Sequence, residues 1–387
     1  MNRESYRAGI IGCGNVVLNA HIPAMLQLLE IETVCVADPV SHNQEKARAL
    51  LGLPRTAGYE NYQAMLAEQR LDYVVLATPP SLRLEIVENC AKAGVHVLAE
   101  KPVAAVPQEA DRQAEVMQAA GCALGFVHNY LYYPEYLLLH RIVTAGEIGA
   151  LRHVTLNFLG VEDKPGSHDY HPGWRHNPGA GGGGVLMDMI HAIYLSEYLV
   201  GAEIRAVSAV VDNFSYPGGA VEDLALVHLY FDKAYATINM GWGSGPGGVE
   251  LTGSEGRTLV FYRDYRTGPF DRLESVTMIN STGRQEFPVQ EEYDGTLNFV
   301  EIHRDFIRAI RDDRPPIATA SAANRSLEAA LAAYLSAYQG KVIDLPFSKS
   351  DPVYLKGVAG LADLPARPNN PVTRRGLFMA TSTGDSR

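Results

Sequence analysis

The sequence is poor in the features that mark secreted or membrane proteins. It has four cysteines, Cys13, Cys35, Cys90 and Cys122, and no two of them form a C-x-x-C pair. Each lies in or beside an apolar run, so we expect small buried side chains in a reducing compartment. No N-terminal stretch resembles a signal peptide, and no apolar run reaches the ~18 residues that a membrane helix needs. We therefore expect a cytoplasmic protein without a membrane partner.

Basic residues are also scarce: 33 Lys and Arg stand against 44 Asp and Glu, a formal net charge of −11. A nucleic-acid-binding domain would show a basic patch or stripe, so we expect no nucleic-acid partner. A phosphorylated ligand remains compatible, because backbone amides at a helix N-terminus bind phosphate without a net positive charge. Apolar residues are plentiful, at 47% of 387. The length suggests two domains, each able to bury a core.

The first 125 residues alternate short apolar runs with helical patterns. The predicted strands are Ala8–Cys13, Thr33–Ala37, Tyr73–Ala77, Val95–Ala99 and Cys122–Val127. The predicted helices between them are Ser41–Leu51, Asn61–Ala67, Leu82–Ala93 and Pro107–Ala120. This alternation is typical of βαβ units around a parallel sheet. We predict an α/β architecture whose residues 1–125 form a doubly wound Rossmann domain.

The pattern changes after residue 125. Helices are predicted at Glu135–Thr144, Val185–Leu199, Thr296–Arg311 and Ala320–Gln339, and β-like runs at Arg152–Gly160, Arg205–Val211, Leu224–Phe231, Ala234–Gly241 and Arg257–Tyr262. Longer strands joined by turn residues indicate a large, mostly antiparallel open sheet in an α+β domain. We assign 126–340 to this substrate-binding and oligomerisation domain. Residues 341–387 form a Pro-rich tail that we expect to wrap the surface or fray.

A nucleotide site is predicted after the first strand, at Gly12-Cys13-Gly14-Asn15-Val16. The two glycines allow a tight turn and a close approach of a pyrophosphate, although Val17 stands where the fingerprint has a third glycine. Asp38 ends the second strand, 24 residues after Gly14, where the fingerprint places an acid for the ribose hydroxyls. A carboxylate there would repel a 2′-phosphate, so NAD is favoured over NADP. The alternative for Asp38 is an ordinary turn residue before Pro39.

The first candidate for chemistry is Glu100-Lys101-Pro102, at the carboxyl end of a predicted parallel strand. Ligands bind at that edge of open α/β sheets. A lysine there can touch both a nicotinamide and a substrate oxygen. The alternative is a solvated Lys–Glu pair at a strand end.

The second candidate is a run of four glycines, 181–184, followed by the predicted helix with Asp188 and His191. Such a run is entropically costly, so it suits a backbone that passes close to a ligand, or a flexible lead into the helix. At i and i+3 the two side chains would share a helix face, as a base and its orienting carboxylate do. The alternative is a helix-start acid and an unrelated histidine.

A metal site is not expected. The loop before the glycine run contains three histidines: His168, His171 and His176. Their spacing matches no strong zinc pattern, and no cysteine lies nearby.

Taken in order, the motifs resemble those of the glucose–fructose oxidoreductase / inositol dehydrogenase (Gfo/Idh/MocA) family over about residues 7 to 340. The segments that carry the resemblance are Gly12-x-Gly14, Asp38, Thr78-Pro79-Pro80, Ala93-Gly94-Val95-His96-Val97-Leu98-Ala99-Glu100-Lys101-Pro102, Trp174-Arg175 and Gly182-Gly183-Gly184-x-Leu186-x-Asp188. The resemblance implies a Rossmann domain, a substrate domain with an open sheet, and a homo-oligomer (dimer or tetramer) formed through that sheet. It also implies oxidation of sugars, polyols or related compounds with NAD or NADP.

The resemblance implies these cofactor-binding residues: Gly12, Gly14, Asn15, Val16, Asp38, Thr78, Pro79, Glu100 and Lys101. The implied substrate-binding residues are His128, Asn129, Trp174, Arg175, Asp188 and His191. Three positions depart from the family pattern. The Asp188–His191 spacing is one residue shorter, Arg83 replaces a usual histidine, and His128-Asn129-Tyr130 replaces a commoner Asn-Arg-Arg.

The predicted reaction transfers a hydride between NAD and a hydroxyl or keto carbon. His191 would be the base, Lys101 would stabilise the developing alkoxide, and Asp188 would orient His191 or bind a second hydroxyl. If His191 points away, Lys101 becomes the base. Two other classes stay open: a lyase, epimerase or glycosidase that uses NAD transiently with no net NADH, and a nucleotide- and sugar-binding sensor without catalysis.

Overall fold

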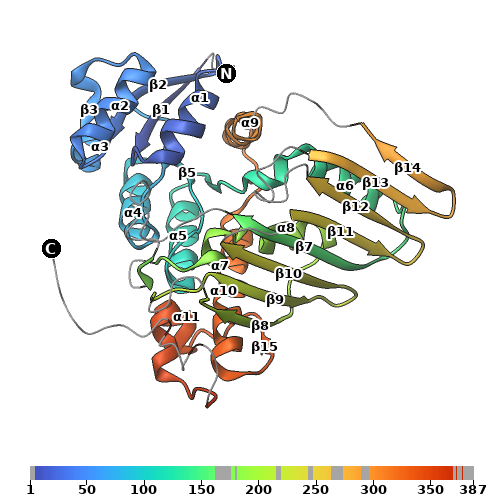
Figure 1. Ribbon diagram of the computed structural model, residues 1–387. Coiled ribbons are helices and arrows are strands. Elements are labelled where there is room, and N and C mark those ends of the chain that lie inside the picture. Colours follow the sequence, from blue (N-terminus) through green and yellow to red (C-terminus); the bar gives the residue numbers. More distant parts are fainter. Residues whose placement is uncertain are drawn as a thin grey trace. The chain divides into compact units, whose positions relative to one another are not determined.

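Figure 1 shows the computed structural model, in which residues 5–161, 176–178, 181–214, 219–242, 247–262, 273–288, 296–368, 372 and 377 are described. The chain divides into two compact units. Unit 1 comprises Met1–Ala104, Glu109–Tyr132 and Tyr293–Asn324, and unit 2 comprises Ala105–Gln108, Tyr133–Glu292 and Arg325–Arg387. The predicted linear boundary at residue 125 therefore differs from this division, because a late segment of the chain returns to unit 1.

Unit 1 contains the predicted Rossmann sheet. Its six strands are all parallel, in the order β3-β2-β1-β4-β5-β6. The strands are β1 (Tyr6–Ile11), β2 (Ile31–Ala37), β3 (Gly58–Tyr59), β4 (Tyr73–Leu76), β5 (His96–Ala99) and β6 (Leu124–Phe126). The helices between them are η1 (Val17–His21), α1 (Ile22–Met25), α2 (Ser41–Leu51), α3 (Tyr62–Glu68), α4 (Arg83–Ala93) and α5 (Pro107–Ala119). Continuous buried runs such as β4 fit a sheet covered on both faces.

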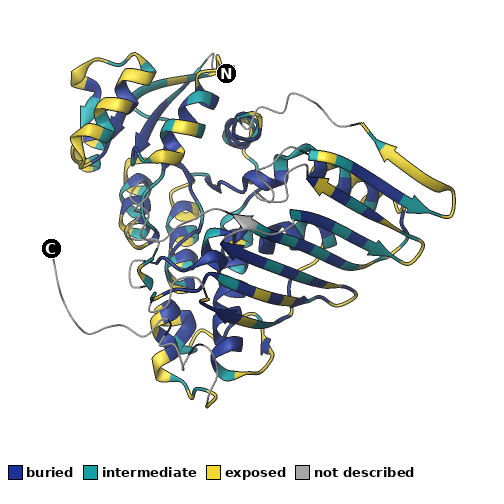
Figure 2. Ribbon diagram, viewed as in Figure 1, coloured by how far each residue is buried: buried dark blue, intermediate teal, exposed yellow. Residues whose placement is uncertain are grey.

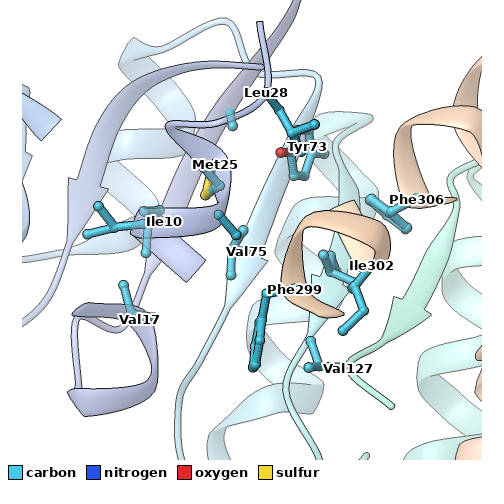
Figure 3. Close-up of a cluster of buried hydrophobic side chains, with 14 of the residues drawn as sticks. Ile10, Val17, Met25, Leu28, Tyr73, Val75, Val127, Phe299, Ile302 and Phe306 are labelled. Carbon is cyan, nitrogen blue, oxygen red and sulfur yellow. The ribbon is translucent and has the colours of Figure 1, made fainter. Parts of the chain in front are cut away.

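The late helix α9 (Leu297–Arg311) belongs to unit 1. From its place in the chain, this helix was predicted to close the second domain. Its apolar side chains Phe299, Ile302 and Phe306 instead join the buried cluster of β1 and β4, as Figure 3 shows. The Phe306 ring meets Tyr73 edge to face at a centroid distance of 5.7 Å. The apolar stripe of an amphipathic helix predicts burial but does not identify the partner surface.

Unit 2 is built on a nine-stranded sheet in the order β14-β13-β12-β11-β7-β10-β9-β8-β15. Its strands are β7 (Leu151–Val161), β8 (Ala206–Asp212), β9 (Leu224–Tyr230), β10 (Tyr235–Trp242), β11 (Gly247–Gly253), β12 (Gly256–Tyr262), β13 (Leu273–Asn280), β14 (Gly283–Phe287) and β15 (Ile343–Asp344). Among the described strands of this sheet, β7 and β10 pair in parallel and the other pairs are antiparallel, so the mostly antiparallel prediction is confirmed.

One face of this sheet is covered by helices, including α6 (Pro134–Thr144) and α8 (His191–Val200) (Figure 1). Burial alternates along the central strands, which appear banded in Figure 2. Many side chains on the other face are intermediate or exposed, and they include Val210, Leu226 and Tyr235. Unit 2 thus has one packed and one open sheet face.

The segment after residue 340 has more structure than its composition suggests. Strand β15 pairs with β8, α11 covers Pro352–Lys356, and the 3₁₀ helix η7 covers Gly357–Asp363. This part of the tail is therefore not frayed. Strands β11, β13 and β14 were not predicted from the sequence. In the part of the chain that the structure describes, no helix is long and apolar enough to span a membrane.

The packing of α9 yields a stability prediction. Replacing fully buried Phe306 with Ala should lower the free energy of unfolding by about 3–5 kcal/mol, through lost burial and a residual cavity. Chemical denaturation measures this. The exposed neighbour Arg308 is the control on the same helix, and Arg308→Ala should change stability by less than about 0.5 kcal/mol. Equal effects of the two substitutions would contradict the packing of α9 in the core of unit 1.

Candidate functional site

The turn after β1 uses its two glycines for different reasons. Gly12 has φ +88°, and a Cβ atom there would lie 2.4 Å from the carbonyl oxygen of Ala77, so the approach of a neighbouring strand excludes any side chain. A Cβ on Gly14 would meet nothing within 4 Å. The next two residues, Asn15 and Val16, are exposed at the start of the helix. Open space at Gly14 beside exposed helix-start residues suits a pyrophosphate.

Asp38 joins the ends of β1 and β2. Its Oδ2 accepts a hydrogen bond from the Cys13 amide at 2.7 Å, and its Oδ1 accepts one from the Val40 amide at 2.8 Å. The two interpretations of Asp38, as a turn residue and as a cofactor-binding residue, are therefore compatible. An ionised carboxylate offers about four lone-pair positions, so two amide bonds leave capacity for ribose hydroxyls. The Cys13 bond also fixes the glycine turn relative to the acid.

Arg83 ties the end of β4 to the segment after β5. Its side chain is buried and donates to the carbonyl of Thr78, with Nη2 at 2.8 Å. It also donates to the carbonyls of Glu100 and Pro102. Burial lowers the pKa of Arg83 to about 10, against the opposing effect of Glu100, so the guanidinium keeps its charge at neutral pH. The Thr78 Oγ1 atom is shielded from solvent and has no hydrogen-bond partner among the described residues.

The Glu100 carboxylate lies at the centre of a buried polar chain in unit 1. Its Oε1 is 3.0 Å from His21 Nε2, and His21 Nδ1 is 3.0 Å from Nε2 of His303 on α9. Its Oε2 accepts the backbone amide of Lys101 at 3.1 Å. Burial alone would raise the pKa of Glu100, but the His21 hydrogen bond and the charges of Lys101 and Arg83 bring it below its ordinary value. Glu100 is therefore an ionised group inside the fold, and the alternative of a solvated Lys–Glu pair is wrong.

In unit 2, the glycine run is shaped by Glu222 and Tyr334. A Cβ on Gly184 would lie 1.9 Å from the Glu222 carbonyl oxygen, and one on Gly183 would lie 2.6 Å from the Tyr334 hydroxyl. Glycine is therefore required at these two positions because the backbone passes close to other atoms of the protein. The Glu222 carboxylate accepts the amides of Gly184 (3.1 Å) and Leu186 (2.9 Å) and the Tyr334 hydroxyl (3.1 Å). This cap fixes the entry to α7 (Val185–Asp188).

Asp188 and His191 do not share one continuous helix. The predicted helix 185–199 is interrupted: α7 ends at Asp188, Met189 has φ −99° and ψ 30°, and His191 begins α8. Asp188 Oδ2 accepts the indole N–H of Trp242 at 3.4 Å. His191 Nδ1 lies 2.6 Å from the hydroxyl of Tyr194. These two partners were missed, because Trp242 and Tyr194 carry no motif.

The remaining predicted substrate residues divide into two groups. His128 and Asn129 are buried, and burial lowers the pKa of His128 to about 3, so this imidazole is neutral. Trp174 and Arg175 lie outside the described residues, as do two of the loop histidines. The third, His176, packs edge to face on Trp242 with ring centroids 5.6 Å apart.

Comparison with known proteins agrees with this architecture. Residues 6–128 match the model of an oxidoreductase family with an NAD-binding Rossmann fold, and residues 136–259 match the GFO/IDH/MocA C-terminal domain. The chain is 29% identical to a dTDP-3,4-didehydro-2,6-dideoxy-α-D-glucose 3-reductase of Streptomyces violaceoruber, over 68% of this chain and 74% of the relative. It is 25% identical to the scyllo-inositol 2-dehydrogenase (NAD(+)) of Bacillus subtilis, over 89% and 97%.

A solved structure shows the same fold at lower identity. The aldose-aldose oxidoreductase from Caulobacter crescentus, in complex with glycerol, aligns with a TM-score of 0.77 at 21% identity. The alignment covers 88% of this chain and all of that one.

The Glu222 cap generates a prediction about pH. Burial raises the pKa of Glu222 to about 7 despite its three donors, so the folded state binds the proton more tightly than the unfolded state does. Its contribution to stability is complete below about pH 4.5 and is lost as the pH rises to 7. Glu222→Gln removes this titration. The stability of the wild type relative to Glu222→Gln should therefore fall by about 3 kcal/mol between pH 4.5 and pH 8.

Thermal and chemical unfolding at several pH values measure this difference. Glu274→Gln is the control, because Glu274 is an exposed glutamate of unit 2. A constant difference between wild type and Glu222→Gln across this pH range would show that Glu222 titrates normally in the fold.

Proposed function

The chain belongs to the Gfo/Idh/MocA oxidoreductase family, and from this membership we propose that it transfers a hydride between NAD and a hydroxyl or keto carbon of a sugar, an inositol-like polyol or a related derivative. One observation carries the proposal: Gly14, Asp38, Thr78 and Lys101 follow the carboxyl ends of four parallel strands of one sheet. Ligands bind at that edge of doubly wound sheets.

We propose NAD rather than NADP as the preferred cofactor. The Asp38 carboxylate is held rigidly by two amides and retains lone pairs for ribose hydroxyls. A 2′-phosphate beside it would be repelled, and no arginine occurs at positions 39 to 45 to offset the repulsion.

The residues of unit 2 would handle the substrate proton. NAD, when bound, supplies the hydride acceptor. His191 accepts the hydroxyl proton at Nε2; in the tautomer that this step needs, its Nδ1–H donates to the Tyr194 hydroxyl, 2.6 Å away. Asp188, held by Trp242, binds a second hydroxyl of the substrate. In unit 1, the Lys101 ammonium stabilises the developing alkoxide, and it is the base if His191 does not reach the substrate.

Two other functions remain distinguishable by experiment. An enzyme that oxidises and then reduces its substrate for epimerisation, elimination or glycoside cleavage would release no NADH. A sensor would bind nucleotide and sugar without turnover, and the combination of Lys101, Asp188 and His191 argues against it, because binding alone does not need these groups. Absorbance at 340 nm with NAD or NADP and a panel of sugars, inositols and sugar acids separates these functions.

We also propose a homo-oligomer, a dimer or tetramer, formed through the open sheet face of unit 2. That face exposes Val210 (51%), Leu226 (37%), Tyr235 (57%) and Phe261 (46%). Val210 and Leu226 are directly paired across β8 and β9, so their apolar surfaces are contiguous. Contiguous apolar surface on a sheet of this size is typical of an interface between proteins.

The catalytic assignment predicts the behaviour of a lysine variant. Lys101→Ala should lower kcat by roughly 10²–10³-fold, because it removes a charge that stabilises the alkoxide, while NAD still binds. Absorbance at 340 nm measures turnover, and fluorescence titration measures NAD affinity. Lys92→Ala, at an exposed position on α4, is the matched control and should behave like wild type. Turnover close to wild type in Lys101→Ala would refute the role of this lysine.

The oligomer proposal predicts the effect of a charge on the open face. Leu226→Asp should dissociate the assembly toward monomers, because burying an unpaired carboxylate in an interface is costly. Sedimentation velocity gives the mass. Leu29→Asp is the matched control in unit 1, where Leu29 is 94% exposed, and it should leave the mass unchanged. An unchanged assembly in Leu226→Asp would place the interface elsewhere.

A further inference from the structure

A histidine from the far end of the chain joins the buried polar chain of unit 1. His303 lies on α9, 282 residues after His21, and its Nε2 is 3.0 Å from His21 Nδ1. His21 and His303 are both fully buried, and their rings meet edge to face at 5.2 Å. No motif predicted either residue, and the hydride-transfer steps do not use them.

The surroundings assign the hydrogens of the two imidazoles. The ionised Glu100 can only accept, so His21 carries a hydrogen on Nε2 and donates it. His303 is neutral, since burial and the neighbouring His21 lower its pKa well below the ordinary value. Its Nδ1 has no hydrogen-bond partner among the described residues, and an unpaired N–H there would be costly. The single hydrogen of His303 therefore lies on Nε2 and is donated to His21.

The chain ends at the backbone of Lys101. Glu100 uses one carboxylate oxygen for His21 and the other for the Lys101 amide. Arg83 holds the carbonyls of Glu100 and Pro102 on either side of that lysine. The Lys101 backbone is therefore fixed through its amide by the histidine–glutamate chain and through the flanking carbonyls by Arg83.

Simple core packing does not account for His303. Its neighbours on α9, Phe299, Ile302 and Phe306, are apolar members of the cluster in Figure 3. An imidazole buried in such surroundings costs free energy unless its polar atoms are paired. The pairing that it obtains is with His21 alone among the described residues. Phe299 packs edge to face on the His21 ring at 5.0 Å, so α9 holds that ring by a second contact.

We propose that His303 is a positioning residue for the reaction: it donates to His21, holds the His21 ring where its Nε2–H reaches Glu100, and so holds Lys101 in its reactive position. The inference rests on the proposed role of Lys101. It adds a residue that lies outside the nucleotide and substrate motifs, because helix α9 contributes to the position of Lys101.

The test compares two substitutions of His303 with one control. His303→Phe fills the space but cannot donate, whereas His303→Gln keeps an N–H donor. Tyr73→Phe is the matched control, because the Tyr73 ring packs beside His303 and its buried hydroxyl has no hydrogen-bond partner among the described residues. We expect His303→Phe to lower kcat roughly 10- to 100-fold, as loss of an orienting partner does at metal sites, with the Kd for NAD changed less than about twofold. His303→Gln should recover most of the loss, and Tyr73→Phe should match wild type.

A second measurement is independent of turnover. Nitrogen-15 NMR of histidine-labelled protein should show His21 as the Nε2–H tautomer in every variant, because Glu100 can only accept. The chemical shift of His21 Nδ1 should change in His303→Phe, which removes its donor, and should stay close to the wild-type value in His303→Gln. Thermal unfolding is recorded for every variant, so that a loss of fold is recognised.

The outcomes separate this inference from the proposed function. Wild-type kcat in folded His303→Phe, with Lys101→Ala inactive, overturns the positioning role and leaves the function intact. If His303→Phe and His303→Gln lose kcat equally and both lose thermal stability, His303 has only a structural role, and the positioning role is overturned. Full turnover in Lys101→Ala refutes the proposed function itself.

Discussion

The edge of unit 1 where the cofactor would bind depends on one buried carboxylate, that of Glu100. Taking an ionised carboxyl out of water costs several kcal/mol unless partners replace its hydration. Here each oxygen has a hydrogen-bond partner, His21 on one and the Lys101 amide on the other, with the Arg83 guanidinium nearby. The same contacts that make the charge tolerable also fix the position of Lys101. Stability and positioning therefore follow from the same hydrogen bonds.

Glu222 in unit 2 is a second buried carboxylate, and its hydrogen-bond donors are neutral groups. It too is buried and accepts three hydrogen bonds, from two amides and a tyrosine hydroxyl. These neutral donors do not offset its desolvation, so its pKa is raised to about 7, whereas that of Glu100 is lowered. Both groups are buried, but the pKa of Glu100 is lowered first by the His21 hydrogen bond and then by neighbouring charges, whereas the hydrogen bonds that act on Glu222 come from backbone amides and a hydroxyl. One carboxylate is a fixed charge, and the other is a cap that titrates.

Local patterns in the sequence predicted local features well. Apolar runs separated by helical segments sufficed for five of the six strands of the parallel sheet, and the two-residue β3 was too short to give a pattern. Gly12, Gly14 and Asp38 were recognisable because a nucleotide turn constrains residue type directly. One continuous helix from 185 to 199 was predicted wrongly. The composition favours helix throughout this range, but the backbone leaves the helical conformation at Met189, just after the short helix α7 that Glu222 caps.

Long-range relations could not be read from the sequence. Arg83 stood out only as a departure from a family pattern, and nothing local predicts that its guanidinium binds carbonyls 17 and 19 residues away. The assignment of α9 failed for a related reason: an amphipathic stripe fits any apolar surface, so chain order was the only guide. Because unit 1 is assembled from separated segments, its His21–His303 contact spans most of the chain. Helix α9 is therefore connected to the Lys101 segment by hydrogen bonds through His303, His21 and Glu100, although chain order alone assigns α9 to the other domain.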